Sequence, residues 1–408
     1  MKKIVLITSQ FPCQGGEQFL ETEIKYYCES KSVSYTILPL SKNAFVRKIP
    51  EHIDANNAFI CQSWKRMKFY FFFKSLFRTV LYKELYKEKI NLRKLKILFS
   101  SITFYQYYYE VMRSFLRKSD KSIDIIFYTY WNNEVTYALE SLKNEFDFKL
   151  ISRIHGIDLY KERRSLGYMP LKKQFNKNID ALYVVTRKAI EYLIDNYNVD
   201  KSIIKCGYLG VNDFHIKTLP TDSSKFHMVT CSALKEVKRI DKIIDVLYIL
   251  SKKFKNIKFI WTHIGEGELY DNLKIKARKK LGEKQNVDFD FLGGLDNVKV
   301  YDFYKKNKID VFVNVSESEG VPVSIMEAMS CSIPIVAPNV GGISDMIVNN
   351  ESGFLLSNVC TIDEVCNSLE NISFFKNTKT RMNSHYIFLE KYNAKKNYTR
   401  FIQNINII

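Results

Sequence analysis

The stretch 310–355 constrains the fold of this chain more than any other. It contains two short apolar runs, at 310–315 and 333–337, each bounded by polar residues or proline. Such runs are typical of buried parallel strands. Between them lie a polar loop and a segment of helix-forming composition, with Pro322 where the first turn of a helix tolerates proline. The pattern predicts a strand, loop, helix and strand whose loop follows the carboxyl end of a strand, where open α/β sheets bind ligands.

This loop and helix carry two carboxylates, Glu319 and Glu327. If the helix begins near Val323, the backbone N–H groups of Val321, Val323 and Ser324 converge on a spot suited to a diphosphate. Glu327 would lie about 6 Å further along the helix, at roughly 1.5 Å per residue. A nucleotide diphosphate-sugar has this layout, with ribose and sugar on opposite sides of its phosphates. Taken alone, two such glutamates are more often a solvated helix face.

The run EGVPVSIME from Glu319 to Glu327, followed by Gly341 and Gly342, resembles the E-x7-E signature of retaining GT-B glycosyltransferases of family 4, the glycosyl transferases group 1. The resemblance implies an α/β GT-B fold of two facing Rossmann-like doubly wound domains. It also implies that Glu319 faces the donor sugar, that Glu327 hydrogen-bonds the ribose, and that the loop from Gly320 onward binds the donor. The family needs no metal and no cofactor beyond its nucleotide diphosphate-sugar substrate.

A strand at 226–231 opens the predicted second domain and leads to Lys238. Lys238 has the spacing of the family's lysine that holds the donor diphosphate, where an ammonium would neutralise the charge growing on the leaving group. The family often has an arginine six residues earlier, where this chain has Ser232. This departure makes Arg239 or Lys235 a candidate second cation for the phosphates.

Two glycine turns follow the next strands of the second domain. Gly265 follows the strand at 258–263 without the third glycine of a dinucleotide fingerprint, so an NAD site is not expected. Gly293 follows the strand at 287–292, which resembles the nucleobase-binding edge of the family. The D-x-D formed by Asp288 and Asp290 is interpreted as strand alternation and not as a metal site, because both carboxylates face one side of a strand.

The chain begins with a strand pattern at 3–8, a loop with Gly15, Gly16 and Glu17, and a helix from about residue 18. This order is a start for a doubly wound domain. The two glycines would let the backbone approach a ligand, and the region resembles the acceptor-side or phosphate-side loop of the same glycosyltransferases. A tight turn from strand to helix is an equally good interpretation.

His155 follows the strand at 149–153 and precedes a glycine, which places it well for contact with a substrate. A lone histidine is more often a structural hydrogen-bonding group. The residues from Arg153 to Tyr160 resemble the family's histidine loop, and this resemblance implies that His155 faces the transferred sugar.

Residues 61–118 differ in composition from the rest of the chain. They contain fourteen Lys or Arg against three Glu, a net charge of +11, together with many aromatic side chains. Basic and aromatic residues interleaved on helices suit the headgroup layer of an anionic membrane. They also suit RNA. Helices packed on the sheet, with Lys and Arg reaching to solvent, are the third alternative.

The composition favours a cytoplasmic globular protein with anionic partners. The 408 residues carry a formal charge of +18. The eight cysteines form no C-x-x-C pair, as expected for reduced thiols. No run of eighteen apolar residues occurs, so no membrane-spanning helix is expected, and the apolar run after the amino terminus is too short for a signal peptide. Peripheral attachment to the inner membrane fits the basic, aromatic segment.

We therefore expect an acceptor-side domain at 1–212, a nucleotide-sugar domain at 213–380 and a helix at 381–408 that returns to the first domain. The expected reaction is retaining transfer of a sugar to a saccharide acceptor, lipid-linked by inference from family and charge, in bacterial surface polysaccharide synthesis. Nucleic acid is not an expected partner. Two rivals remain: a sugar-nucleotide epimerase of GT-B shape, which would act without an acceptor, and a basic RNA-binding or scaffold protein, whose binding would fall steeply with salt.

Overall fold

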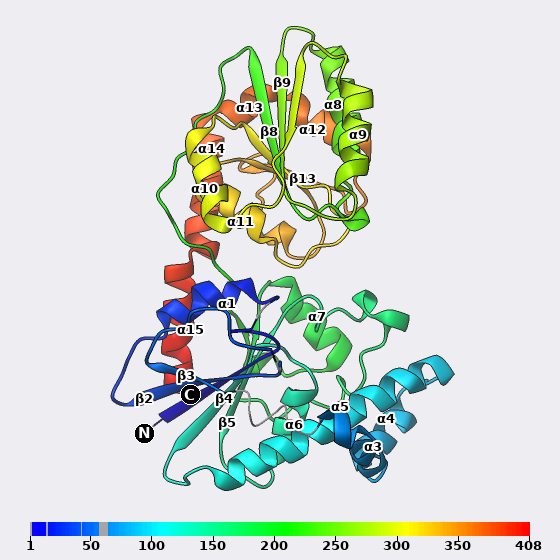
Figure 1. Cartoon of the computed structure of the whole chain (residues 1–408), viewed down its shortest axis with the longest axis vertical. Helices are drawn as coiled ribbons and strands as arrows, with labels where there is room; N and C mark the ends of the chain where they lie inside the picture. The colour runs from blue at the N-terminus through cyan, green and yellow to red at the C-terminus, as the bar shows by residue number, and fades with distance from the viewer. Residues whose placement is uncertain (1, 14, 42, 57–63) are drawn as a thin grey trace. The chain divides into compact units, whose positions relative to one another are not determined.

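The computed structural model describes residues 2–13, 15–41, 43–56 and 64–408, and the chain forms two compact units (Figure 1). Unit 1 comprises Met1–Tyr208 and Tyr398–Ile408, and unit 2 comprises Leu209–Asn397. Each unit has its own parallel sheet and its own apolar core. The predicted α/β class with two doubly wound domains is confirmed.

In the described part of unit 1, the sheet has seven strands in the order β3-β2-β1-β4-β5-β6-β7, all parallel. The strands are β1 Lys2–Thr8, β2 Val33–Pro39, β3 Ile53–Ala55, β4 Asp124–Thr129, β5 Lys149–Ile154, β6 Ala181–Val184 and β7 Ile204–Cys206. From β1 the next strands in the chain are added on one side of the sheet, up to β3, and from β4 onward they are added on the other side. The order thus reverses between β1 and β4, which pair in register through Val5 and Phe127. In open α/β sheets such a reversal opens a crevice at the carboxyl ends of the strands.

Two helical layers cover this sheet because side chains of β1 alternate between its faces. Val5 and Ile7 join one buried cluster with helices α5 and α6, whereas Ile4 and Leu6 join another with α1 and α15. The helices of unit 1 are α1 Gln18–Glu23, α3 Trp64–Ser75, α4 Thr79–Lys87, α5 Leu92–Lys118, α6 Glu134–Leu142, α7 Lys188–Tyr197 and the greater part of α15 Ala394–Ile407.

The basic, aromatic segment expected at 61–118 forms α3, α4 and α5, apart from residues 61–63, which lie outside the described residues. Asn91 begins the long helix α5, because its side chain accepts a hydrogen bond from the backbone N–H of Lys94 at 2.9 Å. No helix among the described residues combines the length and apolar character needed to cross a membrane.

The sheet of unit 2 has six parallel strands in the order β10-β9-β8-β11-β12-β13. They are β8 Lys225–Cys231, β9 Lys258–Ile264, β10 Val287–Phe291, β11 Val311–Val313, β12 Ile335–Pro338 and β13 Gly353–Leu356. The order reverses between β8 and β11. The helices are α8 Asp241–Lys253, α9 Tyr270–Leu281, α10 Asn297–Lys306, α11 Val323–Ser330, α12 Ile362–Glu370, α13 Ile372–Lys376 and α14 Thr378–Ile387. The predicted succession of strand, loop, helix and strand is therefore β11, α11 and β12.

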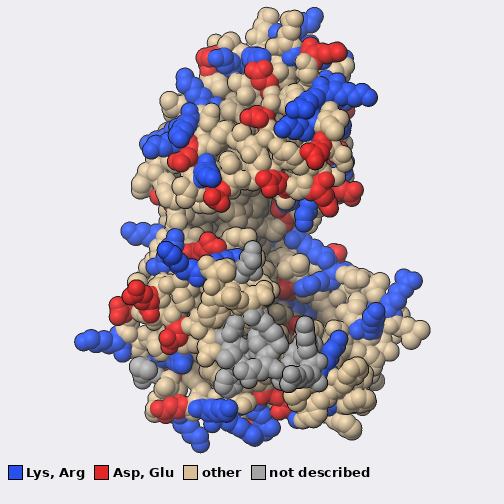
Figure 2. Space-filling view, in the orientation of Figure 1, with Lys and Arg blue, Asp and Glu red and all other residues tan. Residues whose placement is uncertain are grey.

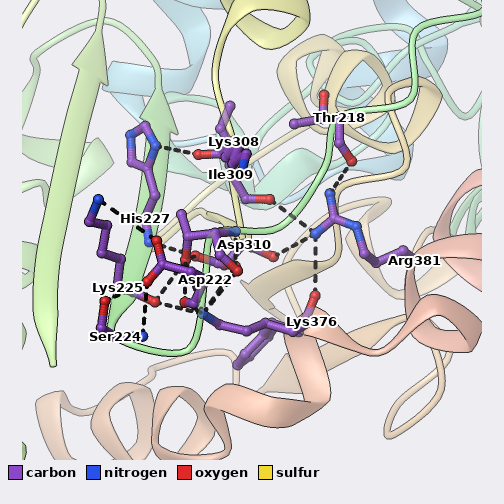
Figure 3. Close-up of polar contacts among 12 residues, drawn as sticks. Thr218, Asp222, Ser224, Lys225, His227, Lys308, Ile309, Asp310, Lys376 and Arg381 are labelled. Atoms are coloured by element: carbon purple, nitrogen blue, oxygen red, sulfur yellow. Dashed lines mark hydrogen bonds and ion pairs between the residues drawn. The ribbon is translucent and has the colours of Figure 1, made fainter.

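A buried polar network fastens α13 and α14 to the amino-terminal end of this sheet (Figure 3). The guanidinium of Arg381 donates hydrogen bonds to the backbone carbonyls of Ile309 at 3.0 Å and Phe375 at 3.2 Å. The carboxylate of Asp310 accepts from the backbone N–H of His227 at 2.7 Å and lies 3.8 Å from the ammonium of Lys376. Asp310 and Arg381 are buried, and the network lies at the end of the strands opposite to their carboxyl ends, where ligands bind in such sheets.

Candidate active site

Lys238 and Glu319 meet at the point where the strand order of unit 2 reverses. Lys238 follows β8 and Glu319 follows β11, and the ammonium Nζ lies 2.6 Å from Oε1 of the carboxylate. The side-chain amide of Asn314 donates to the same oxygen at 3.1 Å. The two charged side chains are 21% and 10% exposed, so the pair is only partly screened by water. A cation and a carboxylate therefore stand where ligands bind in this class of sheet.

The loop that carries Glu319 is held by the predicted glycine turn. Gly341 has φ +57°, and a Cβ atom built on it would lie 2.0 Å from the carbonyl oxygen of Glu319. The N–H of Gly342 donates to the carbonyl of Gly320 at 2.7 Å. Any larger residue at position 341 would displace the loop, whereas a Cβ on Gly320 itself would meet no atom within 4 Å.

Helix α11 begins at Val323, as predicted, with Pro322 as its N-cap residue. Proline offers no side-chain acceptor, so the first turn carries no side-chain cap. Val321, Val323 and Ser324 are half-buried at this end of the helix. The backbone donors and the partial positive charge of the helix terminus therefore favour an anion here.

Glu327 lies on the buried face of α11 and is 5% exposed. Its carboxylate accepts a hydrogen bond from the side-chain amide of Asn297, at the beginning of α10. Burial raises the pKa of Glu327 to about 7, and the hydrogen bond from Asn297 opposes this rise. Near neutral pH the carboxyl group can thus donate or accept a hydrogen bond, as recognition of a hydroxyl requires. Asn297 was missed from the sequence, where a single asparagine gives no signal.

Ser232, Gly265 and Gly293 come together at the ends of β8, β9 and β10. The N–H of Gly265 donates to the carbonyl of Gly293 at 2.8 Å, and a Cβ on Gly265 would lie 2.0 Å from the carbonyl oxygen of Ser232. The buried hydroxyl of Ser232 and Nε2 of His263 have no hydrogen-bond partner in the described part of the chain. Burial lowers the pKa of His263 to about 4, so this imidazole is neutral at pH 7. Sequence reasoning missed His263.

The candidate second cation, Arg239, is already partnered by carboxylates. It has a left-handed backbone at φ 51°, and its guanidinium pairs with Glu317 and, at 3.6 Å, with Asp241. Lys235 is exposed. A phosphate would therefore compete with two carboxylates for Arg239, but with only one, Glu319, for Lys238.

Asp288 and Asp290 of the D-x-D motif are both exposed on β10, an edge strand. Asp288 pairs with Lys258 at 2.7 Å. This placement agrees with strand alternation. In the residues that the structure describes, no group of three or more His, Cys, Asp or Glu has the spacing to hold a metal ion. The requirement for a metal stays a matter of prediction.

In unit 1, Glu17 closes the loop that follows β1. Its carboxylate accepts hydrogen bonds from the backbone N–H groups of Ser9, Gln10 and Phe11 at 2.7 to 2.8 Å, and from the indole N–H of Trp131 at 2.6 Å. Trp131 follows β4, so Glu17 bridges the two strands at the reversal of this sheet. The side chain of Glu17 is thus occupied in shaping the loop.

The predicted glycine loop itself is exposed. Gly15 and Gly16 have φ +91° and +50°, and a Cβ on either would meet no atom within 4 Å. Their backbone conformation, and not crowding, therefore favours glycine. The guanidinium of Arg47 donates to the carbonyl of Gly15 at 2.7 Å.

His155 stands after β5 with its ring against two aromatic side chains. The ring centroid lies 4.7 Å from that of Tyr130 and 4.5 Å from that of Trp131. Neither ring nitrogen has a hydrogen-bond partner in the described part of the chain. Burial, with a smaller contribution from the charge of Arg153, holds the pKa of His155 well below its usual value. His155 is therefore a neutral imidazole with unused donor and acceptor capacity.

A buried network fixes the loop of His155. One carboxylate oxygen of Asp158 accepts from the backbone N–H of His155 at 2.6 Å, and the other from that of Asn132 at 2.8 Å. The buried ammonium of Lys172 donates to the side-chain carbonyl of Asn132. Burial lowers the pKa of Lys172 to about 8 although the charge of Asp158 opposes this shift. Asn132 and Lys172 had no signal in the sequence.

Comparison with known proteins shows a similarity to glycosyltransferases. Residues 211–385 match the family described as Glycosyl transferases group 1. The O-antigen biosynthesis glycosyltransferase WbnH of Escherichia coli is 28% identical over 231 residues, which cover 55% of this chain and 61% of the relative. The UDP-Gal:alpha-D-GlcNAc-diphosphoundecaprenol alpha-1,3-galactosyltransferase of Escherichia coli is 30% identical over 114 residues, 28% of each chain.

Among solved structures, the apo form of the lipopolysaccharide outer core galactosyltransferase WaaB superposes with a TM-score of 0.69. It is 16% identical, and the match covers 99% of both chains, so it shows a shared GT-B fold. The curated relative WbnH, by contrast, is matched over about three fifths of its length, 61%. The family match includes Lys238, Glu319 and Glu327. Over residues 211–385, within which most of unit 2 falls, the chain is therefore similar to the glycosyl transferases group 1.

Proposed function

We propose that this protein is a retaining glycosyltransferase that moves a sugar from a nucleotide diphosphate-sugar to a saccharide acceptor. The observation that carries the proposal is the contact between Lys238 and Glu319 at the strand reversal of unit 2, beside the uncapped first turn of α11. The site offers positive groups for a diphosphate and a carboxylate for hydroxyl groups. Both are what transfer from such a donor requires.

Departure of the nucleotide diphosphate is the step in which Lys238 acts. Negative charge grows on the bridging and terminal phosphate oxygens as the glycosidic bond breaks, and an ammonium stabilises that charge more strongly than it stabilises the bound donor. Its contact with Glu319 uses one of three N–H donors and leaves two for phosphate oxygens. The backbone N–H groups at the beginning of α11 would supply further donors.

Glu319 and Glu327 are proposed to bind different parts of the donor. Glu319, held by Lys238 and Asn314, would orient hydroxyl groups of the sugar. Glu327 would bind the ribose hydroxyls, displacing or sharing the amide of Asn297. Neither carboxylate is proposed as a covalent nucleophile: the acceptor attacks from the face that the diphosphate leaves. His155, neutral and with unused hydrogen-bonding atoms, is proposed to bind the transferred sugar.

The donor, acceptor and role that we propose are drawn from the names of two related proteins. One relative is named for transfer from UDP-Gal to a GlcNAc-diphosphoundecaprenol, and another for O-antigen biosynthesis. We therefore propose a UDP-sugar donor, a lipid-linked saccharide acceptor and a role in bacterial surface polysaccharide synthesis at the cytoplasmic face of the inner membrane. The transfer is proposed to need no metal, since Lys238 and the terminus of α11 provide the positive charge.

A thermal-shift panel of the full chain tests the donor site. The protein is heated with UDP, GDP, ADP or CDP in EDTA, with NAD as a negative control. A nucleotide at 100 times its dissociation constant should add about 2.7 kcal/mol to the free energy of unfolding. Lys238→Met should lose the shift, and Lys279→Met, at an exposed lysine in the last turn of α9, should keep it. The proposal fails if no nucleotide diphosphate stabilises the protein, or if Lys238→Met responds like the wild type.

A further inference from the structure

Helices α3 and α4 are apolar on two faces, and among the residues that the structure describes only one of these faces is packed. Phe71 of α3 is 4% exposed and its ring contacts that of Tyr107 on α5, with centroids 5.2 Å apart. Leu81 of α4 is 2% exposed in the same core. These contacts dock both helices on unit 1 through one face each.

The opposite face of the two helices, with the turn between them, carries large aromatic side chains in solvent. Phe77 is 86% exposed and Tyr86 is 91% exposed. The exposed aromatic residues here are Phe69, Tyr70, Phe73, Phe77, Tyr82 and Tyr86. Phe69 and Phe73 are four residues apart on one helix, as are Tyr82 and Tyr86 on the next, so each pair shares a helix face. Exposed aromatic residues clustered on consecutive helices mark a surface for interaction.

The charges on this surface are of one sign. Residues 67–100 contain two acidic residues, and neither is a free surface charge. Glu84 is 2% exposed and accepts hydrogen bonds from the hydroxyl of Tyr168 at 2.8 Å and from Gln174, while Glu88 pairs with Lys173 at 2.7 Å. The exposed charged residues of this segment are Lys68, Lys83, Lys87, Lys89, Arg93 and Lys96. Figure 2 shows such blue side chains among uncharged surface over these helices.

A hollow of about 570 Å³ borders the same helix α4. Its lining includes the cations Arg78, Lys83, Lys87 and Lys177. Two carboxylates also line it, but both have partners: Glu140 accepts backbone N–H groups of Asn176, Lys177 and Asn178, and Glu145 pairs with Arg113 at 2.6 Å. The hollow therefore offers cations to an anionic group such as a lipid phosphate.

We propose that this face of α3 and α4 binds the surface of an anionic lipid bilayer. The phenyl rings of Phe69, Phe73 and Phe77 enter the boundary between headgroups and acyl chains, and the lysines lie at the level of the phosphates. RNA bases can also stack on phenyl rings, but Phe69, Phe73 and Phe77 do not line the cationic hollow, as a groove that tracks an RNA backbone would require. The arrangement therefore favours lipid over RNA. The inference extends the proposed function, because such a surface would bring the enzyme to a lipid-linked acceptor, but the binding itself does not depend on catalysis.

Sedimentation with vesicles tests this inference on the full chain. Vesicles of phosphatidylcholine alone are compared with vesicles that also contain phosphatidylglycerol. We expect binding to the anionic vesicles that weakens as salt rises. The double variant Phe73→Ser, Phe77→Ser should bind them at least about tenfold less tightly, because two large apolar side chains no longer enter the interface. Lys83→Glu combined with Lys87→Glu should lose the preference for anionic lipid.

Tyr386→Ser serves as the matched control, since Tyr386 is an aromatic residue of unit 2 that is 63% exposed. It should bind vesicles like the wild type. Equal binding to neutral and anionic vesicles, wild-type binding by the phenylalanine double variant, or binding to RNA without binding to vesicles would each overturn the inference. The nucleotide thermal shift is measured on the same variants. If the wild type shows the nucleotide thermal shift but does not bind vesicles, the membrane inference fails and the proposed function stands.

Discussion

The ammonium of Lys238 lies 2.6 Å from the carboxylate of Glu319, although 81 residues separate them in the sequence. The contact exists because β8 and β11 are neighbours in the sheet, and each residue stands on the loop after one of these strands. It joins the group proposed to stabilise the diphosphate to the group proposed to hold the sugar. A change at either residue should therefore affect the other.

Replacing Lys238 with Met, or Glu319 with Gln, should lower kcat/KM for sugar transfer by at least about 30-fold, equivalent to about 2 kcal/mol of transition-state stabilisation. The double variant should lose less than the product of the two single effects, since each single change already breaks the pair. Steady-state kinetics of the four proteins measure the coupling. Strictly multiplicative losses would show that the two residues act separately, and wild-type kinetics in folded Lys238→Met would remove it from the mechanism.

The raised pKa of Glu327 predicts a pH dependence of stability. Its pKa is about 7 in the folded chain against 4.5 as the ordinary value, so the folded state holds a proton that the unfolded state releases between these pH values. The free energy of unfolding should therefore fall as pH rises from about 4.5 to 7, by roughly 3–4 kcal/mol at 1.36 kcal/mol per pKa unit. Glu327→Gln, which has no proton to lose, should gain stability relative to wild type over this range.

Urea unfolding at pH 5 and pH 8 checks the prediction for Glu327. Glu351→Gln, at an exposed glutamate, provides the control and should follow the wild type at both pH values. A difference between wild type and Glu327→Gln that is the same at both pH values would mean that the carboxyl group does not titrate in this window.

Glu23 of α1 and Arg153 of β5 form an ion pair whose side chains are 0% and 1% exposed. Glu23 also accepts a hydrogen bond from the hydroxyl of Tyr27 at 3.1 Å, and the Arg153 guanidinium lies 4.3 Å from the ring centroid of Phe401. Arg153→Met should lower the free energy of unfolding by about 3–5 kcal/mol because it leaves a buried carboxylate without its cation.

Adding Glu23→Gln to Arg153→Met should restore part of the lost stability, because the uncompensated charge is then removed. The comparison is made by urea unfolding. Lys258→Met, at a pair with the exposed Asp288, should change stability by less than about 1 kcal/mol. A loss for Arg153→Met as small as that for Lys258→Met would contradict the prediction that the buried pair stabilises the fold more than an exposed pair does.

Patterns along the chain were sufficient to predict β11, α11 and β12, because apolar runs, a proline and a glycine turn are local signals. The beginning of α11 at Val323 was predicted for the same reason. The partners of the site residues were not predictable in this way. Asn297, which donates to Glu327, and Lys172, which donates to Asn132, are brought near by the packing of elements far apart in sequence.

Composition also could not separate the two faces of α3 and α4. The segment is aromatic throughout, so its sequence does not tell which rings pack on α5. The structure buries Phe71 and exposes Phe69 and Phe73. The predicted roles of Glu17 and His155 toward a substrate stay predictions, whereas the structure establishes their contacts within unit 1.

The contacts of Glu17 predict that it stabilises the loop after β1 through its carboxylate. Glu17 is 8% exposed and accepts four hydrogen bonds, from Ser9, Gln10, Phe11 and Trp131. Glu17→Ala should lower the free energy of unfolding by about 2–4 kcal/mol, because these buried donors lose a charged acceptor. The released indole of Trp131 should shift the tryptophan fluorescence.

Glu21→Ala is the control, at an exposed glutamate of the same segment whose carboxylate lies 3.3 Å from Arg47. It should change stability by less than about 1 kcal/mol and leave the fluorescence unaltered. Equal effects of Glu17→Ala and Glu21→Ala would contradict the proposed role of Glu17 in stabilising the loop. If Glu17→Ala loses stability but keeps the wild-type thermal shift with nucleotide, the role of Glu17 is confined to unit 1.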